Sequence, residues 1–587
     1  MFALNPLQCA IVAMMPLKFK LLFSLLTAGV PISSSPTNHG TCSQSLTHDD
    51  IFREPAVPAR SSPLSPRQRG LVCRSDTFDG ILPKDALIES IDRVSNGSSY
   101  GEGPSNIAYP TNPTNLPELC AVTVKVTTSP TSAYRFGLLM PTQWNYRFLA
   151  VGNGGFSGGI NWLDTGAGAR MGFATMSTDT GHNSTSGDLR WALNEEERRK
   201  DFGYRAMHGS VVLSKLLIHA YYSDGPSRSY YSGCSTGGRQ GLKEVQLHAD
   251  SFDGLLIGAP AWWSTGLAVW TTMIGVNNLP AGAPNHIPPN LVAALGREVM
   301  RQCDKVDGLE DGIISSPEAC SFNFDGIRCG TSGVSATTCL TNEQIKTAQR
   351  AYADYSINGK FAFSGLSLGS EDLWGVLMGQ PTPDARGQEY IKMFVLNDPN
   401  WHWSAFNDSI MALAADMDPG DLTADNFDLS QFRDRKGKII MYHGDADGLI
   451  PTRSSDYYYN KTIEAMGGLS GLRSWFRYFH VPGLGHCSGT RVNAPWYFGA
   501  GNQAGSLGSG TNSVPGLADA KHDALLALLD WVEKGAVVDS IVATTWKVPT
   551  NATSGVLRQR PICAFPEKAT IINRDGDEKS VDNWKCV

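Results

Sequence analysis

Short apolar runs alternate with amphipathic helical patterns along most of the chain beyond residue 70. Such alternation of buried strands and helices is typical of βαβ units around a mostly parallel sheet. The hydrophobic pattern therefore predicts an α/β fold. The predicted strands are 134–140, 146–152, 172–178, 229–233, 254–259, 438–444 and 476–481.

Two helices stand out because their apolar residues recur at the 3.6-residue helical period. The first spans 202–222, and the second spans 524–535 and ends at Gly535, a residue typical of helix termini. The predicted buried face of the first helix consists of Tyr204, Met207, Val211, Ile218 and Tyr222.

The rhythm of strands and helices breaks down between about residues 262 and 430. This stretch is rich in Trp, Pro and Gly, and four of the chain's twelve cysteines fall within 303–339. The simplest interpretation is a sheet interrupted by a cysteine-stapled insertion. We therefore expect one domain made of 71–262 and 431–587, with a second domain inserted at 263–430.

The N-terminal region resembles a secretory signal. Lys18 and Lys20 precede the short apolar run 21–31, which is too short to span a bilayer. We expect a signal peptide at 1–30 and a flexible leader or pro-segment at 31–70. No later run reaches membrane-spanning length, and a net charge of -7 gives no basic footprint for nucleic acid. The sequence thus predicts a secreted protein with neither nucleic-acid nor membrane partners.

Secretion makes disulfides the expected state of the cysteines. Cys9 would leave with the signal peptide, and the eleven others include one that cannot pair internally, for which we favour Cys42. Five N-x-S/T sequons are candidate glycosylation sites. They begin at Asn96, Asn183, Asn407, Asn460 and Asn551.

The candidate chemistry begins at 233–237, which fits the G-x-S-x-G pattern of a serine on a strand-to-helix turn. A serine hydroxyl needs a base to take its proton and an acid to orient that base. His486 follows a predicted strand and is the candidate base. Asp445 and Asp447 both follow another strand, and the pattern alone does not separate them.

Two other histidines have structural interpretations. His443 lies between a predicted strand and a glycine, and we interpret it as a hydrogen-bonding residue rather than the base. His480 lies inside an apolar strand and is interpreted as a core histidine. Cys234 precedes the candidate nucleophile and Cys487 follows the candidate base, so a catalytic contact between Ser235 and His486 would bring these cysteines within disulfide reach.

Three segments, GCSTGGRQG, HGDADGLI and GLGHC, together resemble the secreted tannase and feruloyl esterase family, over most of residues 70–587. That family also includes enzymes that cleave the mono(hydroxyethyl) ester of terephthalate. The resemblance implies an α/β-hydrolase fold, in which 71–262 and 431–587 form the catalytic domain and the inserted domain 263–430 is a lid. It also implies Ser235 as nucleophile, His486 as proton shuttle and Asp447 as the triad acid.

Further site residues come from the same resemblance. The backbone N–H of Thr236 would hold the oxyanion, together with an N–H from the loop 152–159, where we favour Gly155 although the pattern does not fix which glycine. The implied disulfides are Cys234–Cys487, Cys73–Cys120, Cys303–Cys320, Cys329–Cys339 and Cys563–Cys586.

The acidic segment 304–313 has carboxylates at short intervals with turning glycines, which suits a hard cation, although a solvated acidic turn explains the residues equally well. The resemblance implies a structural calcium ion here and no organic cofactor. Its ligands would be side-chain oxygens of Asp304, Asp307 and Asp311 and the backbone carbonyls of Leu309 and Ile313.

Trp262 and Trp263 follow a predicted strand and could pack a phenolic ring, with core packing as the alternative role. We expect a secreted serine carboxylic-ester hydrolase that releases hydroxycinnamic acids (ferulic, p-coumaric, caffeic) from plant cell-wall polysaccharides. The alternatives are a tannase acting on gallate esters, another aromatic-acid esterase, and a catalytically silent hydrolase-fold binding module.

Overall fold

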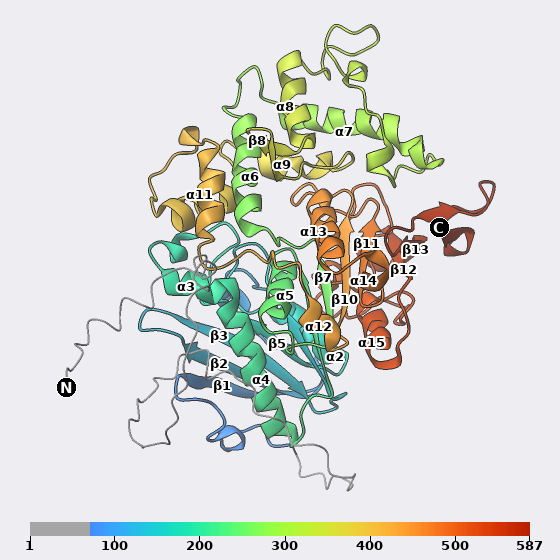
Figure 1. The fold of residues 1–587 in the computed structure, drawn as a ribbon. Coiled ribbons are helices and arrows are strands. Elements are labelled where there is room, and N and C mark those ends of the chain that lie inside the picture. The colour runs from blue at the N-terminus through green and yellow to red at the C-terminus, as the bar shows by residue number, and fades with distance from the viewer. Residues whose placement is uncertain (1–70) are drawn as a thin grey trace, which may run out of the picture. The chain divides into compact units, whose positions relative to one another are not determined.

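The computed structural model describes residues 71–587. The predicted signal peptide, the leader, Cys9 and Cys42 lie outside the described residues. A nine-stranded sheet in the order β1-β2-β3-β5-β4-β6-β7-β10-β11 forms the centre of the described part (Figure 1). Its strands are β1 Ala86–Val94, β2 Leu119–Thr127, β3 Ala133–Pro141, β4 Arg147–Val151, β5 Ala174–Thr178, β6 Arg228–Cys234, β7 Gly254–Gly258, β10 Lys438–Gly444 and β11 Phe476–Val481.

The sheet is parallel from β5 to β11, and β1, β2 and β3 form an antiparallel edge. All seven predicted strands are present, so the predicted α/β fold is confirmed. Strands β1 and β2 were not predicted. β1 alternates half-buried and exposed residues at the edge of the sheet, and so lacks the continuous apolar run by which the parallel strands were found.

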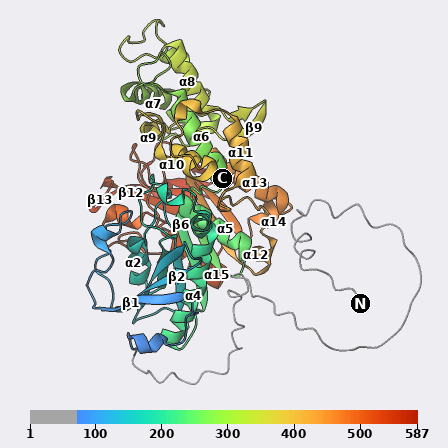
Figure 2. The same cartoon turned by 90° about the vertical axis from the view of Figure 1, so that its left-hand side faces the viewer.

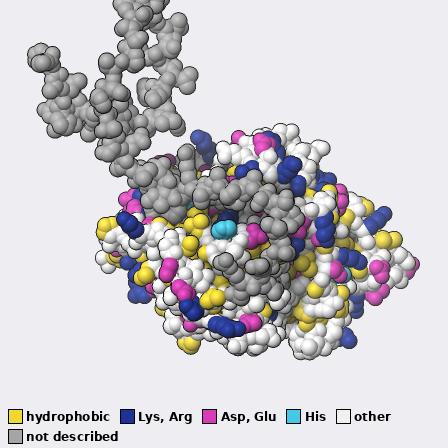
Figure 3. All heavy atoms as spheres, turned by 90° about the horizontal axis from the view of Figure 1, so that it is seen from below, with side chains coloured by type: hydrophobic (Ala, Val, Ile, Leu, Met, Phe, Trp, Pro, Cys, Tyr) yellow, Lys and Arg dark blue, Asp and Glu magenta, His cyan; other side chains and the backbone are white. Residues whose placement is uncertain are grey.

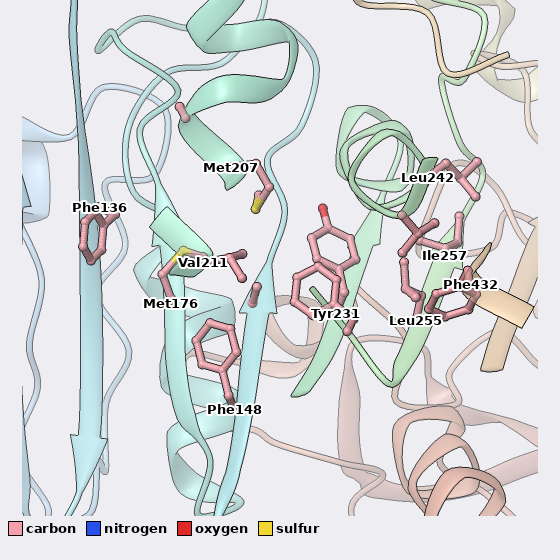
Figure 4. Close-up of a cluster of buried hydrophobic side chains, with 14 of the residues drawn as sticks. Phe136, Phe148, Met176, Met207, Val211, Tyr231, Leu242, Leu255, Ile257 and Phe432 are labelled. Carbon is pink, nitrogen blue, oxygen red and sulfur yellow. The ribbon is translucent and has the colours of Figure 1, made fainter. Parts of the chain in front are cut away.

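Side chains alternate between two cores because successive strand residues point to opposite faces of a sheet. Phe148, Tyr231 and Leu255 pack on one face, under α4 (Ala206–Tyr222) and α5 (Thr236–Leu247), as Figure 4 shows. Leu149, Tyr230 and Leu256 belong to the opposite core, which contains α15 (Ala524–Lys534). The parallel strands are thus covered on both faces.

The two predicted helices form with small changes at their ends. The first begins with a π-helical turn at Asp201–Arg205 and continues as α4, in which Met207, Val211 and Ile218 are buried as predicted. In α15 the Asp523 side chain accepts a hydrogen bond from the N–H of Leu526, and Gly535 adopts the left-handed conformation that ends the helix.

The insertion lies between β7 and β10 and forms a mainly helical lid (Figures 1 and 2). Most residues of its hydrophobic core come from the insertion, and Leu189, Ala192 and Phe202 join it from the segment before β6. Two disulfides staple the lid, Cys303–Cys320 and Cys329–Cys339. Its elements are α6 Ser264–Asn277, α7 Pro289–Cys303, α8 Asn342–Tyr352, β8 Tyr355–Ile357, β9 Lys360–Phe363, α9 Trp374–Met378, α10 Ala385–Tyr390 and α11 Ser409–Met417. The next helix, α12 Ser430–Asp434, lies outside the lid, because Phe432 packs in the core of the sheet.

The remaining elements surround the sheet. The C-terminal strands form two antiparallel pairs, β12·β13 and β14·β15, joined by the Cys563–Cys586 disulfide. The other helices and strands are α2 Trp162–Arg170, α3 Glu196–Lys200, α13 Thr452–Ala465, α14 Leu469–Leu472, β12 Ser540–Val548, β13 Asn551–Cys563, β14 Ala569–Ile571 and β15 Trp584–Cys586.

Acidic and basic side chains are interspersed on the face seen in Figure 3, as far as the described residues show it. Among those residues, no helix combines the length and apolarity needed to cross a membrane. All five sequon asparagines are exposed.

Candidate active site

Ser235 occupies a strained turn between β6 and α5. Its φ of 64° and ψ of -125° lie in a region that non-glycine residues rarely adopt. The turn is held by its backbone, because the N–H of Ser235 donates to the carbonyl of Gly258 at 2.9 Å and the N–H of Ala261 donates to the carbonyl of Ser235 at 3.0 Å. This is the geometry of a nucleophile elbow, which exposes the hydroxyl at the top of the sheet.

A close glycine contact brings a second loop to this turn. A side chain at Gly152, just after β4, would collide with the Cα atom of Gly237 in the first turn of α5. Any larger residue at either position would push the loop 152–159 away from the elbow. The glycines therefore set the distance between the serine and the loop predicted to hold the oxyanion.

Asp447 is the acid that contacts His486. The Nδ1 atom of His486 lies 2.7 Å from Oδ2 of Asp447, while the N–H groups of Leu449 and Ile450 donate to Oδ1. Burial alone would raise the pKa of the Asp447 carboxyl, but His486 and His443 beside it hold that pKa well below its usual range. The carboxylate is therefore charged and immobilised against the candidate base.

His443 and Asp445 do not belong to this pair as base or acid. His443 is fully buried, with Nε2 3.1 Å from Oδ2 of Asp447 and Nδ1 2.7 Å from the hydroxyl of Ser455. It supports the acid, in agreement with the structural role predicted for it. Asp445 instead contacts His480.

The Cys234–Cys487 disulfide forms as expected, with 5.9 Å between the Cα atoms. It joins the last residue of β6 to the residue after His486, so the elbow and the histidine loop are covalently linked. The other four implied pairs are also present, Cys73–Cys120, Cys303–Cys320, Cys329–Cys339 and Cys563–Cys586.

Ser235, Thr236, Gly155 and His486 line one cavity. In the loop 153–159, the N–H groups of Asn153 and Gly154 donate to Gln240 and Tyr109, and those of 156–159 donate to backbone carbonyls. Within this described loop only the N–H of Gly155 has no partner. This free donor in the cavity of Ser235 is compatible with the prediction of Gly155 as the second oxyanion donor.

Sequence reasoning missed Arg239, which lies four residues after the nucleophile and also lines the cavity. Its buried guanidinium donates to the backbone carbonyls of Phe202, Gly203 and Leu422, and burial lowers its pKa to about 10. Arg239 thereby connects α5, the helix after the elbow, to the π-helical turn before α4 and to Leu422 near the end of the lid. Arg239 stands within the segment GCSTGGRQG, but its partners come from distant segments, so the sequence alone did not indicate what it binds.

The aromatic residues of the cavity differ from those expected. Trp262 is buried and its indole N–H donates to Ser454, while Trp263 packs against Phe361 and Phe363. Neither tryptophan lines the catalytic cavity. That role belongs to Phe156 and Phe202, whose rings stack with centroids 5.4 Å apart. The tryptophans therefore have the alternative, core-packing role.

The acidic segment 304–313 curls on itself. Backbone N–H groups within the segment donate to the carboxylates of Asp304, Asp307 and Asp311, and Asp311 also pairs with Arg560. Burial raises the pKa of Asp304 and Asp307, and the charge of Asp311 adds to both shifts. Among residues 71–587, however, no three acidic, histidine or cysteine side chains converge as a metal site. The donors are of the type calcium takes, but in this geometry they do not form a finished site.

The nucleophile elbow at the end of a parallel strand, with the acid and histidine on later strand ends, defines the class of the protein as an α/β-hydrolase. The lid and the disulfide beside the triad narrow this class further. A profile of the family "Tannase and feruloyl esterase" matches residues 120–587, and the chain belongs to that family of carboxylic-ester hydrolases.

Individual relatives agree with this assignment. The chain is 33% identical over 502 residues to a probable feruloyl esterase B-2 of Aspergillus terreus, covering 84% of this chain and 92% of the relative. It is 33% identical over 524 residues to a probable feruloyl esterase B-1 of Aspergillus flavus, covering 87% and 96%. The crystal structure of feruloyl esterase B from Aspergillus oryzae superposes with a TM-score of 0.79 at 31% identity, over 88% of this chain and 99% of that one.

Proposed function

We propose that the protein is a secreted feruloyl esterase that releases hydroxycinnamic acids from plant cell-wall polysaccharides. The observation that carries this proposal is the similarity along nearly the whole length of relatives named feruloyl esterase B, together with a catalytic cavity that has aromatic walls. The exposed sequons and the five disulfides support an extracellular setting and glycosylation at the five asparagines.

The proposed reaction proceeds through an acyl-enzyme. The Ser235 hydroxyl attacks the ester carbonyl while His486 takes its proton, and the charge on Asp447 stabilises the resulting imidazolium. The N–H groups of Thr236 and Gly155 hold the negative oxygen of the tetrahedral intermediate. His486 then gives the proton to the leaving alcohol oxygen, and a water molecule attacks the acyl-serine by the same route to release the acid.

The cavity walls suit an aromatic acyl group. Phe156, Phe202 and Leu422 offer flat and apolar surfaces, and Leu267 and Leu377 extend them from the lid. Arg239 adds a positive charge whose donors are used by backbone carbonyls, while the charge of Arg386 is paired with Asp384. No carboxylate among the described lining residues is left to bind a cationic acyl group. A planar ring with an uncharged or partly negative phenolic oxygen fits this mixture of contacts.

A panel of methyl esters tests the substrate class. We expect kcat/KM for methyl ferulate, caffeate and p-coumarate to exceed that for methyl gallate at least tenfold, because the apolar walls favour the longer cinnamoyl group. The assay is hydrolysis by the purified protein, with methyl sinapate added to the same series. A preference for gallate would make the protein a tannase. Absence of turnover on every ester would contradict the proposed activity and favour the catalytically silent binding module.

We also propose a structural calcium ion at the acidic segment. Its ligands would be side-chain oxygens of Asp304, Asp307 and Asp311 and carbonyls of Leu309 and Ile313. The mutual repulsion of these carboxylates and their donor chemistry support the proposal. Calcium binding has to displace the Arg560 side chain from Asp311. No step of the proposed reaction depends on the calcium ion.

We expect chelation with EDTA to lower the melting temperature and added Ca²⁺ to restore it, because an ion that binds the folded state alone stabilises that state by about 4 kcal/mol at a thousandfold excess over Kd. The Asp307→Asn variant should lose this response. Asp325→Asn, an exposed acid paired with Arg328 elsewhere in the lid, serves as the matched control. A melting temperature that is unchanged by both EDTA and added Ca²⁺ would refute the calcium site.

A further inference from the structure

His480 links the two loops that carry the triad acid and base. Its Nδ1 atom lies 2.8 Å from Oδ1 of Asp445, and its Nε2 atom lies 3.0 Å from Oδ1 of Asp456. Asp445 is two residues before Asp447, and His480 is six residues before His486. The imidazole therefore joins the end of β11 to the acid loop and to α13.

The backbones of the two loops are also in direct contact. The N–H of Asp445 donates to the carbonyl of Val481 at 3.0 Å, and that of Ala446 donates to the carbonyl of Leu484 at 3.1 Å. A side chain at Gly444 would collide with the carbonyl of Leu484, so the contact leaves no room for adjustment. A shift of one loop must move the other, and with it the distance between Asp447 and His486.

His443 and His480 form a matched pair. They are register partners on the parallel strands β10 and β11, so their side chains leave the sheet on the same face. Consecutive residues of α13 hold them, since Ser455 contacts His443 and Asp456 contacts His480. One histidine supports Asp447 directly, and the other supports the loop in which Asp447 lies.

The two acidic neighbours of His480 keep its imidazole positively charged. Burial by itself lowers the pKa of His480, but the charges of Asp456 and Asp445 outweigh it and hold the pKa well above the ordinary value. Asp445 is almost fully buried, and the imidazolium is its charged partner. Loss of the imidazole would leave that carboxylate buried and unneutralised, which drives the loop to rearrange.

We propose that His480 is a positioning residue for catalysis, which sets the geometry between Asp447 and His486 by clamping Asp445 to Asp456. The sequence interpretation of His480 as a core histidine is thereby replaced, because its side chain is 34% exposed and bound by two carboxylates. This inference rests on the proposed triad mechanism.

The first experiment is His480→Gln assayed on methyl ferulate. We expect kcat to fall at least tenfold with KM within twofold of wild type, because the acyl cavity is untouched while the acid and base lose their alignment. His522→Gln is the matched control, since His522 pairs with Asp519 outside the triad loops and should leave kcat unchanged. If His480→Gln does not fold, Asp456→Asn removes the negative charge from one of the two contacts of His480, at a side chain that is 33% exposed.

Chemical rescue separates positioning from general stability. His480 lines a cavity of about 960 Å³ that is lined by neither Ser235 nor His486, so a small cation can reach the vacated place. Imidazole added to His480→Ala should restore kcat at least fivefold and should not activate His522→Ala. An unchanged kcat in His480→Gln, or a loss that imidazole does not reverse, would overturn the inference. If Ser235→Ala retained activity, the triad mechanism itself would fail instead.

Discussion

Replacement of Ser235 by alanine is expected to lower kcat by about a millionfold, to the residual rate supplied by the oxyanion donors and substrate binding. The loss is this large because the Ser235 hydroxyl forms the covalent bond of the acyl-enzyme, and alanine has no atom that can replace it. Substrate binding should survive, since the aromatic and apolar walls of the cavity do not involve the serine side chain.

The measurement is single-turnover and steady-state hydrolysis of methyl ferulate by Ser235→Ala. The control is Ser232→Ala, which removes the same hydroxyl three residues earlier on β6, outside the catalytic cavity, and should change kcat less than threefold. Equal losses in both variants would indicate damage to β6 rather than removal of the nucleophile. Substantial activity in Ser235→Ala would refute the assignment of the triad.

Loss of the Cys234–Cys487 disulfide is expected to have the largest effect on stability. The bond closes a loop with a sequence separation of 253, for which a chain-entropy estimate gives about 5.5 kcal/mol, and measured losses of native disulfides are about 2–5 kcal/mol. The Cys234→Ala/Cys487→Ala variant should also lose tenfold or more in kcat, because the elbow and the histidine loop are then held by noncovalent contacts alone.

The matched control is Cys329→Ala/Cys339→Ala in the lid, where the sequence separation is 10 and the same estimate gives about 3 kcal/mol. Denaturant unfolding and kcat are measured for both variants. The control should lose stability and keep kcat. The same small change in kcat for both pairs would show that the bond beside the triad does not constrain its geometry.

The sequence was sufficient for the parallel part of the sheet and for the residues at its strand ends. Strands such as β7 and β10 are buried on both faces and appear as continuous apolar runs between turns. The motifs around Ser235, Asp447 and His486 are local, so they were found without knowledge of tertiary contacts. The disulfide pairing followed from the family resemblance, and from the required contact between serine and histidine for Cys234 and Cys487.

The missed features depend on packing between distant segments. Arg239 finds its partners at Phe202 and Leu422, and the aromatic walls combine Phe156 with Phe202, which no local pattern connects. The antiparallel edge strand β1 carries polar residues because one side of it meets solvent. In the sequence, His480 is flanked by the apolar residues of a strand. In the folded protein, its imidazole contacts acidic residues on a loop and on a helix, and only the tertiary structure brings these together.

The placement of the lid between β7 and β10 has a consequence for biosynthesis. β10 pairs directly with β7, although residues 259–437 separate them in the chain. A nascent chain therefore makes the nucleophile elbow early, then has to synthesise the whole lid before the strand that carries the acid loop can join the sheet. Long-range pairing of this kind folds slowly, and unfilled strand edges are prone to aggregation. The lid supplies most of its hydrophobic core and contains two internal disulfides, so it can compact before β10 pairs with β7. The catalytic site is complete only after the lid, β10 and the histidine loop after β11 have all been synthesised.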